Sequence, residues 1–293
     1  MRNHQLSQAD CAIAQAAAVV GEWWTLLIVR DIAGGIHRFD ELHAELAISR
    51  KVLSERLAAL VGEGVLDRRR YVERPPRYEY HLTSAGEALI PVLIALQDWG
   101  SRYVLGDGTV SATADPRSPE ARRVAGLAGV GVPTLALASG DGHPRDPVAD
   151  AGWTVVFCYP GAYAASSGYP EGWSEIQGAA GCTLEAATFR DRFSEFASFG
   201  AKVVGVSTQR PGDQRAFAEK ARLPYPLLSD QELRLAAALR LPTFRAGGRD
   251  HLKRLTLIVD GEREIRHVIY PIADPAASVG RALALLAQAL AQA

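Results

Sequence analysis

Cysteine is scarce in this chain of 293 residues, which contains only Cys11, Cys158 and Cys182. Three scattered cysteines exclude a disulfide-stabilised scaffold, so free thiols in a reducing compartment are expected. No Cys-x-x-Cys pair occurs, and the seven histidines have no paired spacing suited to a metal. The sequence therefore predicts neither a metal site nor a bound cofactor.

An excess of charge of one sign and a long apolar run are also missing. The 32 Lys and Arg against 33 Asp and Glu leave a net charge of −1, which excludes a globally basic nucleic-acid coat. Any basic site must therefore be local. No apolar run reaches bilayer length, and Met1 to Gln5 leads into polar sequence instead of an apolar signal core. We expect a soluble, cytoplasmic protein with no membrane contact.

Hydrophobic residues are ample and are divided between two regions. They make up 48% of the chain, which supports at least one sizeable core, and a length of 293 residues favours two domains. Residues 106–131 are rich in small and turn-forming residues, which bury little area. This stretch predicts a linker, with a short helix near 120–127, between domains of residues 1–105 and 132–293.

The N-terminal region has the pattern of helices followed by a short hairpin. Leu53, Leu57, Leu60 and Val61 share one face of a predicted helix. Two short strand patterns flank a Pro-Pro pair and predict the hairpin. The expected helices are residues 13–20, 23–32, 39–46, 53–61 and 84–99, and the expected strands are 65–71 and 78–82. This order predicts an α+β winged helix-turn-helix domain.

Basic side chains gather on the predicted recognition helix and on the hairpin. The second helix of such a motif reads base edges from its N-terminal half, which here carries Ser49, Arg50, Lys51 and Ser54. Residues 48–78 hold eight Lys or Arg against four Asp or Glu. A solvated basic face on a structural hairpin is the alternative. The guanidinium groups predicted to contact phosphates belong to Arg68, Arg69, Arg70, Arg74 and Arg77.

The same region resembles a known family. Residues 21–31 read GEWWTLLIVRD, and later segments read FDEL, LSERL and PPRYEYHLTSAG. Together they are similar to HxlR-type regulators over about residues 8–103. The resemblance implies a homodimer, with the first and last helices at its interface, bound to a pseudo-palindromic operator in double-stranded DNA. We expect Leu89, Leu93 and Leu96 to be buried in that dimer.

Cys11 belongs to the same resemblance. In several members of the family the matching cysteine senses oxidants or electrophiles, which implies a redox-sensing role for Cys11. A helix N-terminus can lower a thiol pKa, which favours reactivity. The alternative is a small apolar residue near the start of a helix.

The C-terminal region alternates strand and helix patterns. The segment TVVFCY at 154–159 is the first buried strand. Further strands are expected at 202–207, 255–259 and 265–270, and helices at 184–199, 214–221 and 276–291. Strand–helix–strand units predict an α/β fold with a partly parallel sheet.

Cys182 stands at the predicted first turn of a helix that follows a strand. Backbone N–H groups and the helix dipole stabilise a thiolate at such a position. A thiolate can attack a peroxide O–O bond and become a sulfenic acid, which a second thiol must resolve. Arg254, at the start of a later strand, is the candidate for lowering the thiol pKa further. We therefore expect the pKa of Cys182 to lie below the reference of about 8.5.

These segments also resemble a family. The pieces VVFCYPG, GCTLE, FRD, VGVS, FAEK, PLLSD and RLTLIVD are similar, in order, to the peroxiredoxins of the thioredoxin-like superfamily. The resemblance spans about residues 132–290. It implies Cys182 as the peroxidatic cysteine, Arg254 as its arginine and Thr183 in the same catalytic set. It also implies a peroxide or other oxidant as substrate and an external thiol as reductant.

The sequence departs from the peroxiredoxin pattern near the cysteine. The usual Thr three residues before it is Ala179, and the usual Pro seven residues before it is Glu175. Residues 162–177 look like an insertion, and the aromatic residues Trp153, Tyr163 and Trp173 either pack around it or line a pocket there. Ala187 occupies the position of one subfamily's resolving cysteine, and Cys158 falls in a predicted buried strand. An external thiol or Cys11 is then expected to resolve any catalytic cycle.

The sequence thus predicts a redox-responsive transcriptional regulator, in which a winged helix domain is fused to a peroxiredoxin-like domain. Two alternatives stay open. One is a thiol peroxidase whose DNA-binding domain only localises or regulates it. The other is a dimeric repressor whose thioredoxin-like module is silent, with Cys182 as a buried structural thiol.

Overall fold

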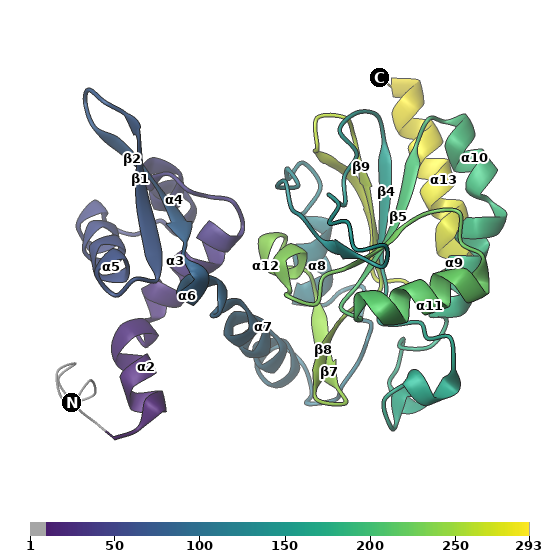
Figure 1. Cartoon of the computed structure of the whole chain (residues 1–293), viewed down its shortest axis with the longest axis horizontal. Helices are drawn as coiled ribbons and strands as arrows, with labels where there is room; N and C mark the ends of the chain where they lie inside the picture. Colours follow the sequence, from purple (N-terminus) through teal and green to yellow (C-terminus); the bar gives the residue numbers. More distant parts are fainter. Residues whose placement is uncertain (1–9, 293) are drawn as a thin grey trace. The chain divides into compact units, whose positions relative to one another are not determined.

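The computed structural model describes residues 10–292, so residues 1–9, with the polar start of the chain, and residue 293 lie outside the described part. The chain divides into two compact units, Met1–Leu93 (unit 1) and Ile94–Ala293 (unit 2) (Figure 1). The boundary falls within the helix α7 (Ile90–Trp99).

Unit 1 has the element order that the sequence predicts. The expected helix over 84–99 is divided in two, with Pro91 in the first turn of the second part, where a missing N–H removes no helical hydrogen bond. The strands β1 and β2 pair antiparallel and form the hairpin. The elements are α2 (Ala12–Val20), α3 (Trp23–Ala33), α4 (Phe39–Leu46), α5 (Arg50–Gly62), β1 (Leu66–Val72), β2 (Arg77–Leu82), α6 (Ser84–Glu87) and the start of α7.

The core of unit 1 forms where α3, α4 and α5 meet. Leu53, Leu57 and Leu60 of α5 are buried together with Ile28 of α3 and Leu42 of α4. The apolar stripe predicted from the helical spacing is therefore confirmed. Because this stripe faces inward, the opposite face of α5 is left to solvent.

Within residues 94–292, unit 2 contains a six-stranded sheet in the order β10-β9-β4-β5-β6-β3. The strands β4, β5 and β6 are parallel, and the others join antiparallel, so the predicted partly parallel sheet is confirmed. A separate hairpin, β7–β8, was not predicted. The strands are β3 (Ala138–Ser139), β4 (Thr154–Cys158), β5 (Lys202–Ser207), β6 (Leu227–Ser229), β7 (Thr243–Ala246), β8 (Arg249–Leu252), β9 (Leu255–Val259) and β10 (Ile265–Ile269).

Helices flank this sheet, with α9, α10 and α13 on one side and α8 and α12 on the other (Figure 1). The expected helix over 184–199 is divided into α9 and α10. The helices are η1 (Gly100–Val104), α8 (Pro119–Ala125), η2 (Ser166–Gly168), η3 (Trp173–Glu175), α9 (Cys182–Asp191), α10 (Phe193–Ser198), α11 (Pro211–Ala221), α12 (Arg234–Ala238) and α13 (Pro275–Gln292).

The main core of unit 2 lies between β4 and the helices α9 and α13. Phe157 of β4 stacks on Phe189 of α9 with ring centroids 4.4 Å apart, and Val279 of α13 packs in the same cluster. This packing fixes the start of α9 beyond the carboxyl end of β4. In sheets with parallel strands, ligands bind beyond those strand ends.

Residues 106–131, expected as a linker, belong to unit 2 and pack within it. Ala112 is fully buried in a cluster with Trp173 and Phe244, and its N–H donates to Gln177 O at 2.8 Å. On α8, Glu120 accepts a hydrogen bond from Lys253 Nζ at 2.9 Å. Small residues allow the backbone of this stretch to approach the unit closely. The domain limits 1–105 and 132–293 stay a prediction.

One apolar helix pair stands out near the start of the described chain. Among residues 10–292 no single helix is long and apolar enough to cross a membrane. The bent pair α2 and α3 reaches that length and apolarity only when its two helices are taken together. The α3 residues Ile28, Val29 and Ile32 are buried in the core of unit 1.

Candidate functional site

Cys182 is the first residue of α9, directly after the loop that leaves β4. Gly181 precedes it with φ at 98°, a left-handed conformation that favours glycine. A Cβ at Gly181 would also lie 2.7 Å from Pro275 Cγ. The tight turn therefore brings the thiol to the N-terminus of the helix, where its side chain is 3% exposed.

Arg254 lies immediately before β9 and reaches the Cys182 sulfur. Its Nη2 donates to Cys182 Sγ at 3.2 Å and to Ala180 O at 2.9 Å. Its Nη1 donates to the carboxylate of Glu185, one turn further along α9. Arg254 is 1% exposed and Glu185 is fully buried. The structure thus brings together the predicted pair Cys182 and Arg254 and adds Glu185, which the sequence analysis did not single out.

Burial sets the electrostatics of this cluster. It raises the pKa of the Cys182 thiol, against the lowering effects of the Arg254 charge and the Gly161 backbone N–H. The expectation of a lowered pKa for Cys182 is therefore not met, because removal of the sulfur from water outweighs both groups. Burial also raises the pKa of Glu185 to about 7, against the effect of Arg254.

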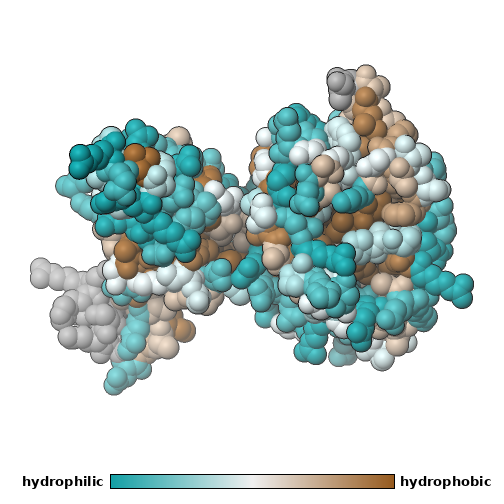
Figure 2. Space-filling view, turned by 45° about the horizontal axis from the view of Figure 1, so that its top comes forward, coloured by the Kyte–Doolittle hydropathy of each residue, from teal (hydrophilic) through white to brown (hydrophobic). Residues whose placement is uncertain are grey.

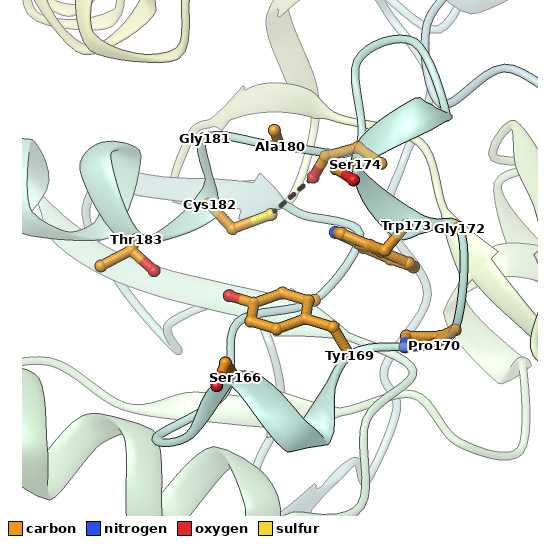
Figure 3. Close-up of a pocket in the computed structure, with 12 residues that line it drawn as sticks. Ser166, Tyr169, Pro170, Gly172, Trp173, Ser174, Ala180, Gly181, Cys182 and Thr183 are labelled. Carbon is orange, nitrogen blue, oxygen red and sulfur yellow. Dashed lines mark hydrogen bonds between the residues drawn. The ribbon is translucent and has the colours of Figure 1, made fainter.

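The other residues predicted for redox chemistry lie elsewhere. Cys158 is fully buried in β4, and burial raises the pKa of its thiol far above the ordinary range. Cys11 is exposed at the N-cap of α2 in unit 1. Thr183 is exposed on the rim near Cys182, and Figure 3 shows its side chain pointing away from the sulfur.

A pocket of about 380 Å³ opens beside Cys182 (Figure 3). One wall is the turn from Ala179 to Thr183. The other wall is the segment 162–177. Of the aromatic residues considered in the sequence analysis, Trp173 lines this pocket, whereas Trp153 and Tyr163 do not. The lining residues from this segment are Ser166, Tyr169, Pro170, Gly172, Trp173 and Ser174.

The hairpin β7–β8 supports that wall. The ring centroid of Phe244 lies 5.9 Å from that of Trp173, and the His251 ring meets Trp173 edge-on at 5.0 Å. The available sequence signal was Gly247-Gly248 between two short strand patterns, a two-residue hairpin turn.

Among the described residues, no group of three His, Cys, Asp or Glu is placed to hold a metal ion.

The proposed recognition surface of unit 1 is exposed and polar. Ser49 caps α5, its hydroxyl accepting from Val52 N–H at 3.2 Å. Arg50 pairs with Asp40 at 2.9 Å, and its guanidinium lies 4.9 Å from the centroid of the Phe39 ring. Lys51 and Ser54 are exposed on the same helix.

The hairpin arginines are all exposed, and three of them are held by neighbours. Arg68 lies over the Tyr78 ring at 4.4 Å, and Arg70 donates to the Tyr78 hydroxyl at 3.1 Å. Arg69 pairs with Asp67 at 3.0 Å. The face around β1–β2 is mostly hydrophilic (Figure 2). Two further arginines make no ion pair with any residue that the structure describes, namely Arg74 and Arg77.

Arg38, just before α4, was missed by the sequence analysis. Its Nε donates to Glu79 of β2 at 3.0 Å, and its guanidinium lies 4.8 Å from the Tyr71 ring centroid. It lines a cavity of about 580 Å³ together with Arg50 and Arg77. The sequence signal for Arg38 was its positive charge, but the residue lies before the stretch 48–78 in which basic residues were counted.

Comparison with known proteins gives each unit a family. The HxlR-like helix-turn-helix family matches residues 19–107, and the AhpC/TSA family matches residues 173–268. An uncharacterized HTH-type transcriptional regulator of Mycobacterium tuberculosis is 40% identical over 115 residues, 36% of this chain and 73% of that protein. A protein of the same organism named as a peroxiredoxin is 36% identical over 135 residues, 46% of this chain and 78% of that protein. The chain belongs to both families.

The HxlR-like and peroxiredoxin resemblances drawn from the motifs are therefore confirmed, as is the fold class. The chain is an HTH transcriptional regulator domain fused to a peroxiredoxin-like domain. A solved structure, that of peroxidoxin BcpB from M. tuberculosis, is 33% identical and covers 55% of this chain and 96% of its own, with a TM-score of 0.46.

Proposed function

We propose that this protein is a redox-responsive transcriptional regulator whose peroxiredoxin-like domain senses or reduces peroxide through Cys182. The observation that carries the proposal is the hydrogen bond from Arg254 Nη2 to Cys182 Sγ, 3.2 Å long, at the edge of a pocket. A cationic donor on the sulfur favours the thiolate, which is the nucleophile toward peroxide. In this proposal the same guanidinium also orients a peroxide oxygen.

The chemistry requires a second thiol. Attack by the Cys182 thiolate forms an S–O bond and breaks the O–O bond, which leaves a sulfenic acid and releases an alcohol or water after protonation. Cys158 is fully buried in β4 and is unsuited to resolve that sulfenic acid. We therefore assign resolution to an external thiol or to Cys11. A reducing cytoplasm is the compartment that supplies such a thiol.

DNA binding is assigned to α5 and the β1–β2 hairpin, and it requires a dimer. A single recognition helix reads one half-site, so a pseudo-palindromic operator needs two protomers. The helix α2 has no buried residue, and its Ile13 is 81% exposed. Apolar area of this kind favours an interface between copies. Of the predicted stripe, Leu89 and Leu93 pack on the unit 1 core, and Leu96 is half exposed.

Two other functions compete with this proposal. The pocket beside Cys182 favours a thiol peroxidase with an accessory DNA-binding domain, because turnover needs a substrate site. The raised pKa and burial of Cys182 favour a silent module in a dimeric repressor. Peroxide consumption with a thiol reductant separates these two, since only the peroxidase consumes peroxide.

The decisive experiment measures operator release under a graded peroxide dose, with mass spectrometry of each cysteine. We expect Cys182 to gain oxygen first and release to follow it, while Cys182→Ser stays bound at every dose. Cys158→Ala is the matched control and should behave as wild type. If Cys182→Ser still releases and Cys11→Ser does not, the sensing role belongs to Cys11.

A further inference from the structure

Trp173 carries a hydrogen-bond donor that no group in the described part of the chain satisfies. The residue is 6% exposed, and its Nε1 is buried without a partner. Buried N–H groups are nearly always paired, so an orphaned one points to a partner that arrives from outside. Figure 3 shows the nitrogen edge of the indole turned toward Cys182 across the pocket.

The indole is held in that orientation by other rings. Tyr169 lies 5.8 Å from it, Phe244 5.9 Å and His251 5.0 Å, measured between ring centroids. A side chain packed on several rings has little rotational freedom left to lose when a ligand binds. The N–H group is therefore preorganised.

The opposite wall of the pocket is short of side-chain donors. The turn before Cys182 contributes Ala179, Ala180 and Gly181, none of which carries a polar side chain. Arg254 already directs Nη2 to Sγ and Ala180 O. A second oxygen of a bound peroxide would thus find its side-chain donor on the segment 162–177.

The pocket is too large for hydrogen peroxide alone. Its volume is about 380 Å³, whereas a water molecule occupies roughly 30 Å³ of liquid, and hydrogen peroxide has only one oxygen atom more than water. Small-molecule sites fall in this range of volumes. Tyr169 and Pro170 add apolar surface beside the indole, which suits an organic substituent.

We propose that the segment 162–177 completes the peroxide site: Trp173 Nε1–H donates to the leaving oxygen, and the Tyr169 and Trp173 rings hold the organic group of a bulky hydroperoxide. This inference rests on the proposed function of Cys182. In the reaction, Sγ takes the terminal oxygen of the hydroperoxide and is oxidised to a sulfenic acid. The O–O bond breaks, and the alkoxide, stabilised by the indole N–H, takes a proton from solvent and leaves as the alcohol.

The test compares single-turnover oxidation of Cys182 in the full-length protein by cumene hydroperoxide and by hydrogen peroxide, followed by sulfenic acid trapping and mass spectrometry. Trp173→Phe keeps the ring and removes the N–H. We expect it to slow oxidation by both peroxides by roughly a hundredfold to a thousandfold, as loss of one donor to a developing oxyanion does. Trp153→Phe is the matched control, because Trp153 does not line this pocket.

Two further variants separate the donor from the apolar wall. Trp173→Phe combined with Ala179→Thr places a hydroxyl in the same pocket and should recover most of the lost rate. Tyr169→Ala removes one ring of the apolar wall and should slow oxidation by cumene hydroperoxide more than oxidation by hydrogen peroxide, so the preference for cumene hydroperoxide should fall.

The outcomes distinguish the two proposals. If wild-type Cys182 is oxidised by neither peroxide, the proposed function fails and this inference fails with it. If wild-type Cys182 is oxidised but Trp173→Phe and Tyr169→Ala match it with both peroxides, only the role of the segment 162–177 is overturned.

Discussion

Two arginines carry the two proposed activities, and their surroundings are opposite. Arg50 in unit 1 has a side chain that is 64% exposed and pairs with Asp40 at the surface. Arg254 in unit 2 is 1% exposed and pairs with the fully buried Glu185. Exposed pairs contribute about 0–1 kcal/mol, whereas removing one partner of a buried pair costs about 3–5 kcal/mol. DNA recognition can therefore vary with little effect on folding, while the redox site is coupled to the stability of its unit.

The largest effect is expected for Arg254→Ala. It leaves Glu185 buried without its cation, so the free energy of unfolding of unit 2 should fall by about 3–5 kcal/mol. Oxidation of Cys182 should also be lost, since the donor at 3.2 Å from the sulfur is gone. Denaturant unfolding and sulfenic acid trapping measure the two effects. Arg215→Ala, at an exposed pair with Glu219, is the control and should change stability little. If Arg254→Ala has the same free energy of unfolding as wild type, the two arginines do not differ in their contribution to stability.

Arg50→Ala should show the reverse pattern. If Arg50 reads a base edge, its loss should weaken specific operator binding by about 1–3 kcal/mol. Unfolding should change by no more than about 0.5 kcal/mol, because the pair with Asp40 is exposed. A binding titration on a selected operator, with Arg117→Ala of unit 2 as the exposed control, checks this. Equal binding by both variants would argue that Arg50 only pairs with Asp40.

The contrast between surface and interior also explains what the sequence could predict. The stripe Leu53, Leu57 and Leu60 follows from local periodicity, and the exposed position of Arg50 follows with it. The approach of Arg254 to Cys182 spans more than seventy residues, so no local periodicity predicts it, and its prediction depended largely on the family resemblance. The raised pKa of Cys182 could not be predicted at all, because burial depends on how every surrounding element packs.

The segment 162–177 shows the same limit. Its aromatic residues are visible in the sequence, but their place is set by distant groups such as Phe244 and His251 on β7–β8. No periodicity links these positions. A sequence pattern indicates which residues have chemistry to offer, and long-range packing decides which of them meet.

A change in pH is expected to have a smaller effect, and its influence on the Cys182 thiol tests the burial of that residue directly. Because burial raises the pKa of Cys182, the thiol is mostly protonated at neutral pH, and its alkylation rate should rise about tenfold per pH unit up to that pKa. The folded state holds this proton more tightly than the unfolded chain. The contribution of this proton to the free energy of unfolding is therefore fully present below the ordinary thiol pKa. It is lost as the pH rises from there through the raised pKa of the folded state. Mass spectrometry of iodoacetamide labelling between about pH 6 and 10 measures the rate. Full-rate labelling at neutral pH would show an activated, accessible thiolate instead.

The smallest effect is expected on the β1–β2 hairpin, where the charged side chains are exposed and partly paired with opposite charges. Arg69 pairs with Asp67 at 3.0 Å, with exposed fractions of 63% and 51%. Arg69→Ala should weaken binding to all sequences alike and reduce the salt slope by about one, because it removes a phosphate contact and no base contact. Asp67→Asn should act in the opposite direction, since it frees Arg69 and removes a negative charge near the DNA backbone. Titrations over a range of salt, on operator and random DNA, check both variants. A loss confined to the operator would mean that Arg69 reads bases, and the division of labour between α5 and the hairpin would be wrong.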